Sequence, residues 1–489
     1  MKLLELAASA QIDYSGPDVA VRGLAYDSRR VEPGFLFVAV PGTRVDGREF
    51  VAEAVDRGAV AIVSQASPAA LIEQVALVQV TDARSALARL ANEFYGRPSE
   101  KLKLIGVTGT NGKTTTAYML ESIFRRAGLK TGLIGTIEYR VNGMRLKAER
   151  TTPESLDLQS LLAEMVDGGV EVAVMEVSSH ALELKRIDGC LFTARVFINL
   201  SRDHLDFHGD LEVYFQAKAR LFSDKSFGDG LRLVNIDDDY GRRLASLSDE
   251  IVTFGSAPAD YRPSEIDLTA AGTSFTLSGP MGDLRLSSRL LGAFNLTNLT
   301  AAAAAALELG VDGADVAAGL LGMDHVPGRF EAVAGGQDFQ VLIDYAHTPD
   351  GLEKVLATAR KLAGDHRLIT VFGCGGDRDK GKRPLMGAIA ARLSDVAIVT
   401  SDNPRSEAPS AIIDDILRGV PGESSAEVNV VVDRAEAIRT AVAGASTGDI
   451  VVIAGKGHED YQILNDRVIE FDDRSVAEEA LKERLSGTH

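Results

Sequence analysis

The sequence predicts an α/β fold divided into three domains, and three observations lead to this prediction. With 489 residues, the chain is long enough for about three domains of about 100–200 residues each. Short apolar runs of strand length alternate with helical stretches along it. A glycine-rich segment, GVTGTNGKTTT, occupies residues 106–116 between one such run and an amphipathic helix.

Residues 1–97 are predicted to form a small α/β domain. They contain the strand-like runs FLFVAV at 35–40 and AVAIVS at 59–64, with a helix expected at about 50–58. Because this segment carries no evident cluster of catalytic side chains, binding is its expected role.

Residues 98–328 are predicted to form a central domain with a parallel sheet. The runs VEVAVMEV at 170–177 and RVFINL at 195–200 are almost continuously apolar, which is typical of strands covered by helices on both faces. The alanine-rich stretch at 295–310 predicts a closely packed helix.

Residues 329–489 are predicted to form a Rossmann-like, doubly wound domain. Apolar runs at 340–345, 368–373, 396–400, 428–433 and 449–455 are separated by helical stretches. Each run ends in a polar or glycine-containing loop, where folds of this kind place their ligands.

The composition narrows the class of protein. The net charge of −18 and the pI near 5.0 argue against a general nucleic-acid binder, which would show a basic face. Two cysteines form no disulfide framework, so a cytoplasmic location is expected. No apolar stretch approaches the ~20 residues that a membrane span needs.

The glycine-rich segment predicts a phosphate-binding loop. Its backbone N–H groups and the following helix start suit the phosphates of ATP or GTP. Lys113 is placed to reach the β- and γ-phosphates, and Thr114 to offer its hydroxyl to Mg²⁺. Since Gly106 and Gly112 enclose five residues instead of the usual four, we expect Gly109 to make the turn.

Two further strands end in ionisable side chains. Glu176 closes the run at 170–177, and a carboxylate in that place commonly holds the Mg²⁺ of the nucleotide. Residues 203–208 carry four ionisable side chains directly after a buried strand. We expect His204 to be functional and His208 to be a solvated loop residue.

These and three later motifs occur in an order that resembles the Mur ligases, which build the peptide stem of bacterial peptidoglycan. The resemblance covers essentially the whole chain. The motifs are GTNGKT at 109–114, EVSSH at 176–180, NLSRDH at 199–204, NLTN at 295–298, PGRFE at 327–331 and DYAHTP at 344–349.

The resemblance implies a ligase that uses ATP to turn a carboxylate into an acyl phosphate, which an amine then attacks. Thr114, Glu176, His204 and Lys218 are the implied Mg²⁺ ligands, with Lys218 carbamylated by CO₂ to N6-carboxylysine. Lys113 neutralises charge on the transferred phosphoryl group. The implied ATP-binding residues are Gly109, Thr110, Asn111, Gly112, Lys113, Thr114, Thr115, Asn295, Asn298, Arg329 and Asp344.

The segment Asp402-Asn403-Pro404-Arg405 resembles the signature of members that add meso-2,6-diaminopimelate to UDP-N-acetylmuramoyl-L-alanyl-D-glutamate. Arg405 and Asn403 suit the second carboxylate of that amino acid, because a guanidinium binds a carboxylate bidentately. Arg378 is the second candidate cation. Gly455 and Glu459 match positions that receive the distal amine.

The resemblance places UDP in the first segment and the muramoyl-dipeptide against the central one. The matching positions are Ser28, Thr43, Arg44, Val45, Thr151, Thr152, Ser178 and Arg186. The expected partners are therefore small molecules, with no nucleic acid and no membrane insertion, and a monomer is expected.

Two alternatives remain open. One is another ligase, either a lysine-adding relative or a folylpolyglutamate synthase, and the Asp-Asn-Pro-Arg segment and the leading domain disfavour it. The other is a P-loop switch without ligase activity. Glu176, His204 and Lys218 argue against the switch, since it needs no second metal site.

Overall fold

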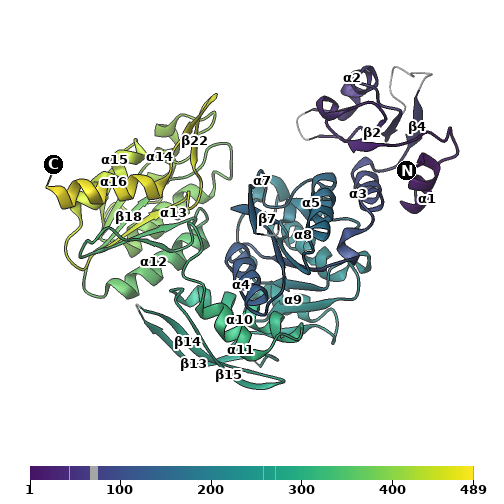
Figure 1. Cartoon of the computed structure of the whole chain (residues 1–489). Helices are drawn as coiled ribbons and strands as arrows, with labels where there is room; N and C mark the ends of the chain where they lie inside the picture. Colours follow the sequence, from purple (N-terminus) through teal and green to yellow (C-terminus); the bar gives the residue numbers. More distant parts are fainter. Residues whose placement is uncertain (43–44, 67–74, 142, 257, 270, 488–489) are drawn as a thin grey trace.

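A computed structural model describes residues 1–42, 45–66, 75–141, 143–256, 258–269 and 271–487. Figure 1 shows an N-terminal, a central and a C-terminal unit, with the central unit between the other two. Each contains a sheet with parallel strands covered by helices, so the predicted α/β fold class is confirmed. The domain boundaries after residues 97 and 328 remain proposals.

The N-terminal sheet is wholly parallel, in the order β1-β2-β3-β4. Its strands are Gly23–Ala25, Phe35–Val38, Ala61–Ser64 and Ala76–Gln79. Helices α1 (Leu3–Ser9) and α3 (Ala83–Phe94) pack on one face, and α2 (Val51–Asp56) packs on the other.

The central sheet has the order β12-β11-β10-β5-β9-β6-β7-β8, and only β7 runs against the other strands, so that its pairings with β6 and β8 are antiparallel. The strands β5 to β12 are Lys103–Thr108, Thr131–Ile134, Glu138–Val141, Met144–Lys147, Val172–Glu176, Ala194–Phe197, Leu231–Asn235 and Val252–Phe254. The predicted runs at 170–177 and 195–200 form β9 and β10, on either side of β5.

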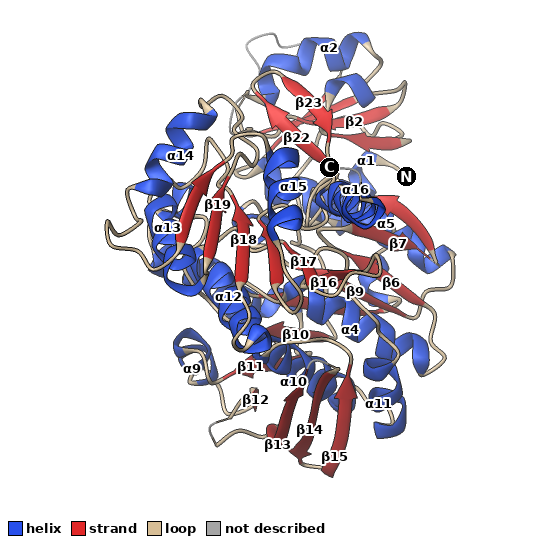
Figure 2. Cartoon of the chain, turned by 90° about the vertical axis from the view of Figure 1, so that its left-hand side faces the viewer, coloured by secondary structure: helices blue, strands red, loops and turns tan. Residues whose placement is uncertain are grey.

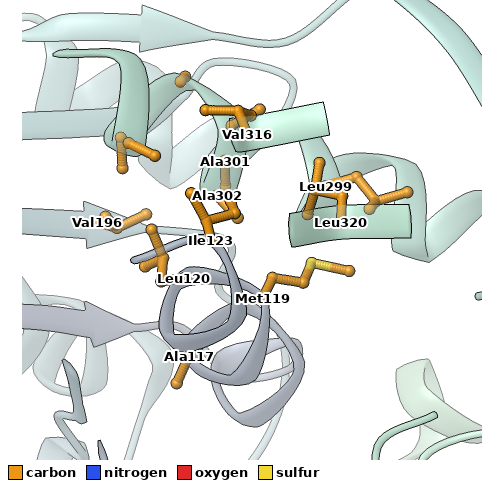
Figure 3. Close-up of a cluster of buried hydrophobic side chains, with 14 of the residues drawn as sticks. Ala117, Met119, Leu120, Ile123, Val196, Leu299, Ala301, Ala302, Val316 and Leu320 are labelled. Atoms are coloured by element: carbon orange, nitrogen blue, oxygen red, sulfur yellow. The ribbon is translucent and has the colours of Figure 1, made fainter. Parts of the chain in front are cut away.

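Helices cover both faces of this sheet. One face carries α4 (Lys113–Arg126), α10 (Ala293–Glu308) and α11 (Gly313–Leu321). In Figure 3, Leu120 and Ile123 of α4 meet Ala301 and Ala302 of α10 in one apolar cluster. The other face carries α5 (Ser155–Asp167), α6 (Ser179–Glu183), α8 (Leu211–Ser223) and α9 (Asp239–Ala245).

A separate antiparallel sheet was not foreseen. It consists of β13 (Arg262–Thr269), β14 (Gly272–Gly279) and β15 (Gly282–Ser288). Figure 2 shows it as a sheet of its own beside α10. Phe275, Leu277 and Leu286 join the core around α10, so this sheet supports the helix that carries Asn298.

The C-terminal sheet has the order β16-β17-β21-β18-β19-β20, with only β16 antiparallel. The strands are β16 (Glu331–Val333), β17 (Gln340–Asp344), β18 (Leu368–Phe372), β19 (Val396–Val399), β20 (Glu427–Val430) and β21 (Ile450–Ala454). A β-hairpin follows, made of β22 (Tyr461–Leu464) and β23 (Arg467–Glu470).

Helices lie on both faces of the C-terminal sheet, as a doubly wound domain requires. One face carries α12 (Pro349–Ala363), α13 (Lys382–Leu393) and α14 (Pro409–Leu417). The other carries α15 (Arg434–Gly444) and α16 (Asp473–Ser486). In the ranges that the structure describes, no helix is long and apolar enough to cross a membrane.

Candidate active site

The glycine-rich loop joins β5 to α4, as predicted, but a different glycine makes its turn. Gly112 caps the helix with φ +89°, whereas Gly109 is not among the residues with positive φ. A Cβ on Gly112 would lie 2.3 Å from Asn298 Oδ1, and one on Gly109 would lie 3.1 Å from Ile198 Cβ. Gly112 therefore provides the left-handed turn, and Gly109 permits close packing.

Lys113 folds back over this loop. Its Nζ donates to the carbonyl oxygens of Gly109 and Thr110 at 2.8 and 2.9 Å. Burial lowers the pKa of Lys113, while Glu176 and Asp203 act in the opposite direction. Both carboxylates thus favour a cation at the place where phosphates are expected.

Glu176 at the end of β9 is held by three hydroxyl or amide donors. Thr114 Oγ1 and Thr136 Oγ1 each donate to Glu176 Oε2 at 3.0 Å, and the Thr136 amide donates to Oε1 at 2.8 Å. Arg329 Nη2 in turn donates to Thr114 Oγ1 at 3.0 Å. A residue of the C-terminal segment therefore reaches the predicted Mg²⁺ ligands.

A cavity of about 400 Å³ surrounds this loop and brings together most of the predicted nucleotide residues. Gly109 and Asn295 do not line it. Asn295 accepts a hydrogen bond from Asn298 Nδ2 at 3.1 Å and so supports that side chain from behind. The predicted residues on the wall are Thr110, Asn111, Gly112, Lys113, Thr114, Thr115, Glu176, His204, Asn298, Arg329 and Asp344.

Asp344 ends β17 and is held at both carboxylate oxygens. It accepts from the backbone amides of Phe330 and Ala346, each at 2.7 Å. Burial raises its pKa to about 6, against the effects of Arg329 and of these two amides. The side chain is thus a fixed, buried acceptor at the wall of the nucleotide cavity.

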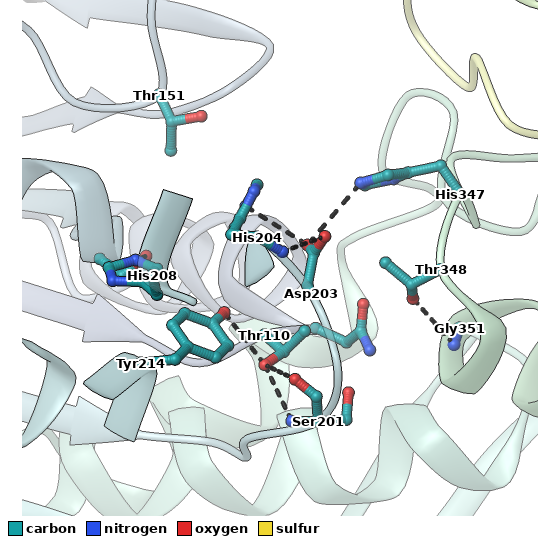
Figure 4. Close-up of polar contacts among 12 residues, drawn as sticks. Thr110, Thr151, Ser201, Asp203, His204, His208, Tyr214, His347, Thr348 and Gly351 are labelled. Atoms are coloured by element: carbon teal, nitrogen blue, oxygen red, sulfur yellow. Dashed lines mark hydrogen bonds and ion pairs between the residues drawn. The ribbon is translucent and has the colours of Figure 1, made fainter. Parts of the chain in front are cut away.

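Asp203 lies between two histidines from different domains, as Figure 4 shows. Its Oδ2 is 3.3 Å from His204 Nε2 and 3.9 Å from His347 Nε2. The two histidines and Lys382 hold the pKa of Asp203 down at about 2 against burial. Burial lowers the pKa of His204 to about 3, which leaves a neutral imidazole able to bind a metal.

The prediction for His208 is wrong. The side chain is buried, and its Nε2 lies 2.9 Å from Ser179 Oγ in a hydrogen bond. Its ring also packs at 5.1 Å from that of Tyr214. The short helix α7 (Leu205–His208) turns the side chain back into the domain, so the residue is structural instead of solvated.

Lys218 lies on α8 and is 1% exposed. Its Nζ donates to Gly109 O at 3.0 Å and to Thr108 Oγ1 at 3.3 Å, beneath the nucleotide loop. Burial and the charge of Lys113 lower its pKa well below the usual range. The direction of this shift favours the neutral amine over the ammonium.

The residues predicted to bind the amino acid come together in a second cavity of about 500 Å³. Its wall includes Arg378, Asp402, Asn403, Arg405, Gly455 and Glu459. Arg405 Nη1 donates to Gly376 O at 2.9 Å, which holds the guanidinium at the loop after β18. Pro404 is not part of the wall. Its carbonyl oxygen packs against Gly376 so closely that a Cβ on that glycine would lie 1.9 Å away.

Asn403 lines the amino-acid cavity, as its motif predicts, and its side chain also holds a neighbouring residue. Its Nδ2 donates to Glu459 Oε2 at 2.8 Å, and its Oδ1 accepts from the Ile463 amide at 2.9 Å. The side chain is 2% exposed. In this structure Asn403 therefore orients Glu459.

A third cavity, of about 590 Å³, holds part of the predicted UDP-substrate set. Ser28, Val45 and Arg186 line it, and Ser28 Oγ donates to Glu53 Oε2 at 2.7 Å. Thr43 and Arg44 lie outside the described residues.

Three other members of that set lie away from the third cavity. Thr151 and Ser178 line the nucleotide cavity instead. Thr152 is fully buried and donates to the Glu176 carbonyl oxygen at 2.8 Å. The resemblance assigns these three positions to the muramoyl-dipeptide and not to UDP, and they lie near Glu176.

The nucleotide and amino-acid cavities meet at a shared wall. Thr136, Thr151, Asp203, His204, Tyr345 and His347 line both. A group that enters one cavity can therefore reach a group in the other next to Asp203 and His204.

Sequence reasoning missed two residues of the C-terminal segment, Lys382 and Asp350, whose roles depend on contacts that are distant in sequence. Lys382 lines the amino-acid cavity and donates to His347 O at 2.8 Å. Asp350 accepts from the Asn111 side chain at 2.8 Å. A possible signal was that Asp350 follows the DYAHTP motif directly and Lys382 begins a helix after the loop that carries Arg378.

Family models match three parts of the chain. The Mur ligase middle domain matches residues 107–306, and the glutamate ligase domain of Mur ligases matches residues 328–457. The catalytic domain model of the Mur ligase family matches residues 20–95.

Full-length curated relatives share about half of the sequence. A protein of Gloeobacter violaceus is 50% identical over 489 residues, with 99% of each chain covered. One of Geobacillus kaustophilus is 48% identical over 99% of this chain and 100% of its own. Both are named UDP-N-acetylmuramoyl-L-alanyl-D-glutamate--2,6-diaminopimelate ligase.

Solved structures agree with the fold. A structure with the same ligase name matches with a TM-score of 0.68 and 33% identity over 99% of both chains. A MurF ligase of Thermotoga maritima in complex with ADP matches with a TM-score of 0.63. That match covers 96% of this chain and 97% of the other at 20% identity, so it shows the shared fold alone.

Proposed function

Since the chain belongs to the Mur ligase family, we propose that it is an ATP-dependent ligase that adds meso-2,6-diaminopimelate to UDP-N-acetylmuramoyl-L-alanyl-D-glutamate. The product is a precursor of the bacterial cell wall, and the reaction takes place in the cytoplasm. The observation that carries the proposal is the shared wall of the nucleotide and amino-acid cavities at Asp203 and His204. An acyl phosphate formed on one side is there within reach of an amine from the other.

The reaction proceeds in two steps. A carboxylate oxygen of the D-glutamate attacks the γ-phosphorus of ATP, and the bond to the ADP oxygen breaks. The neutral amine of diaminopimelate then attacks the acyl carbon, the nitrogen gives up a proton, and phosphate leaves with the electrons of the C–O bond. Placing the two reactants side by side removes much of the entropic barrier to the second step.

The loop residues bind and orient ATP. Thr110 to Thr115 present backbone amides and hydroxyls to the phosphates, and Lys113 supplies the cation. Arg329 links Thr114 to Tyr345, over whose ring its guanidinium lies at 4.5 Å. Asp344 and Asn298 line the same cavity, where they offer an acceptor and an amide to the nucleoside.

The side chains around Glu176 offer atoms that suit Mg²⁺ as ligands. Thr114 and Glu176 provide oxygen ligands 3.0 Å apart, and His204 provides a neutral imidazole. Within the described residues, no group of three or more His, Cys, Asp or Glu side chains is arranged to hold a metal. When bound, Mg²⁺ neutralises charge on the phosphate oxygens.

We further propose that Lys218 reacts with CO₂ to form a carbamate. Its lowered pKa supports the proposal, because only the neutral amine attacks CO₂. The carbamylated nitrogen retains one N–H, which suffices for the bond to Gly109 O. The new oxygens would add the negative charge that a second Mg²⁺ site needs.

The amino-acid cavity supports recognition of a second amino-carboxylate end. Arg405 and Arg378 bring two cations to one part of the wall, and burial together with Arg378 lowers the pKa of Arg405. Glu459 and Gly455 lie on the same wall for the distal amine. The UDP end is assigned to the third cavity, through Ser28, Val45 and Arg186.

A phosphate-release assay tests the proposed function and its two alternatives. Release should require ATP, the UDP-muramoyl-dipeptide and diaminopimelate together, and lysine should replace diaminopimelate poorly. Equal or better use of lysine would assign the chain to the lysine-adding relatives. Release that needs neither the UDP-substrate nor an amino acid would favour the P-loop switch.

A further inference from the structure

Lys456 is a fully buried cation behind the wall of the amino-acid cavity. It follows β21 and Gly455, and its side chain is 0% exposed. Asp402, Asn403 and Glu459 line the cavity in front of it, and Lys456 does not. We propose that Lys456 is a positioning residue that holds the Glu459 carboxylate as an oriented anion for the distal ammonium of the incoming amino acid.

Three polar side chains and the ring of Tyr461 surround the Lys456 ammonium on the side that faces the cavity, with Nζ 5.5 Å from the ring centroid. Its Nζ lies 3.2 Å from Glu459 Oε2, 3.4 Å from Asn403 Oδ1 and 4.0 Å from Asp402 Oδ1. Asn403 Nδ2 donates to the same Glu459 Oε2 at 2.8 Å. Two donors therefore fix one oxygen, and among the described contacts neither takes Oε1, which is left for a ligand.

The charges explain why a cation is needed there. Burial and the nearby carboxylate of Asp402 raise the pKa of Glu459, whereas Lys456 and Asn403 act to lower it. Two neighbouring carboxylates without a cation favour uptake of a proton by one of them. Lys456 offsets one of the two negative charges of this pair. Arg405 and Arg434 also act on both carboxylates, and Tyr345 and Tyr461 face Glu459, but among the contacts of the described residues none of these four makes a hydrogen bond to it.

This inference rests on the proposed function, because it concerns the distal end of diaminopimelate. That end carries an ammonium and a carboxylate. Arg405 and Arg378 suit the carboxylate, and the pair of Asp402 and Glu459 suits the ammonium. 2-Aminopimelate has the same chain and both carboxylates but lacks the distal ammonium, so it probes the two halves separately.

The test compares Lys456→Met, which keeps the length of the side chain and removes its charge, with Lys456→Arg. Lys456→Met should raise KM for diaminopimelate by about 10-fold or more, the effect of losing a charge-assisted contact. KM for ATP and for the UDP-substrate should stay unchanged. The inhibition constant of 2-aminopimelate against diaminopimelate should also stay near that of the wild type. Lys456→Arg should restore part of the loss.

The pH profile separates this role from a purely structural one. Removing the cation raises the pKa of Glu459, so a larger share of its carboxyl is neutral at a given pH. KM of Lys456→Met for diaminopimelate should therefore fall as pH rises through that pKa, while the wild-type KM stays flat over the same range. A KM that is raised but independent of pH would overturn the proposal.

Glu459→Gln keeps the proposal testable if Lys456→Met does not fold. It should weaken binding of diaminopimelate but not of 2-aminopimelate, with no pH dependence. If Lys456→Met folds, the double variant should match Glu459→Gln alone, because both changes remove one interaction. Additive losses, or equal losses for both ligands, would overturn the inference.

The wild-type protein separates failure of the inference from failure of the function. If the wild-type protein releases no phosphate in response to diaminopimelate, the proposed function is overturned and the inference with it. Wild type that is active with diaminopimelate, beside a Lys456→Met variant with unchanged KM values, overturns the inference alone.

Discussion

The side-chain amide of Asn111 donates to Asp350 Oδ2 across 2.8 Å, which joins the nucleotide loop to the first turn of α12. Ser201 Oγ donates to the same oxygen at 3.1 Å, and Lys354 Nζ donates to it at 2.9 Å. One carboxylate of the C-terminal domain thus collects donors from the loop, from the segment after β10 and from its own helix. The position of this domain is thereby coupled to the conformation of the loop.

Asp350→Ala should weaken the use of ATP. Losing the shared acceptor removes hydrogen bonds of about 0.5–1.5 kcal/mol each, so KM for ATP should rise about 2- to 10-fold. KM for the amino acid should change less, since Asp350 does not line that cavity. Glu353→Ala on the same helix is the control, because Glu353 pairs at the surface with Arg392. Equal effects of the two substitutions would mean that the helix as a whole is responsible.

Gly112→Ala should raise KM for ATP in addition to lowering the stability of the protein through backbone strain. Both Gly112 and Gly128 have a positive φ, at +89° and +84°, which costs an alanine about 1–2 kcal/mol. Only at Gly112 would the new Cβ meet Asn298 Oδ1, whereas nothing lies within 4 Å at Gly128. Both variants should therefore lose stability in thermal unfolding because of the strained backbone, and Gly112→Ala should lose more because its Cβ also meets Asn298. Only Gly112→Ala should raise KM for ATP, and an equal rise in Gly128→Ala would contradict this.

The parts of the fold that the sequence predicted well are those with a strong local signal. The buried strands β9 and β10 are continuous apolar runs, and the loop before α4 has a recognisable motif. The sheet β13-β14-β15 was missed because most of β13 is exposed and polar. Its signal was the alternation of buried positions in β14, at Phe275 and Leu277, which is typical of a half-covered strand.

The site could be predicted where one motif supplies the residue, and not where two loops that are distant in sequence supply the contact. Glu459 and Arg405 follow strands that lie far apart in sequence, yet both reach one cavity, as their motifs predicted. The role of Asn403 in holding Glu459 depends on the pairing of loops 56 residues apart. Residue type alone did not distinguish that role from direct contact with a substrate.

Lys218→Ala should be inactive if the lysine carries a carbamate. Short-chain carboxylic acids should restore part of the activity by supplying the missing oxygens, and removal of CO₂ should weaken the wild type. Lys225→Ala, at an exposed lysine shortly after the same helix, should respond to neither treatment. Full activity of Lys218→Ala without any additive would exclude Lys218 from the metal site.

Arg405→Ala should change which amino acid is used. Arg405 Nη1 donates to the carbonyl oxygens of Gly376 and Asn403, so the rest of the guanidinium is available for the distal carboxylate of diaminopimelate. Losing a charged hydrogen-bonding partner costs ~1.5–3 kcal/mol, or roughly 10- to 150-fold in affinity. KM for diaminopimelate should rise by about that factor, and KM for ATP and for the UDP-substrate should stay nearly unchanged.

The decisive measurement for Arg405 is kcat/KM for diaminopimelate and for lysine in the wild type and in Arg405→Ala. Lysine has no distal carboxylate, and its ammonium is repelled by the guanidinium, so its kcat/KM should hold or rise slightly. Arg418→Ala is the matched control, because Arg418 is 74% exposed and pairs with Asp415 at the surface. Should both amino acids lose the same factor in Arg405→Ala, the bonds to Gly376 and Asn403 would be the reason. Arg405 would then support the loop instead of reading the substrate.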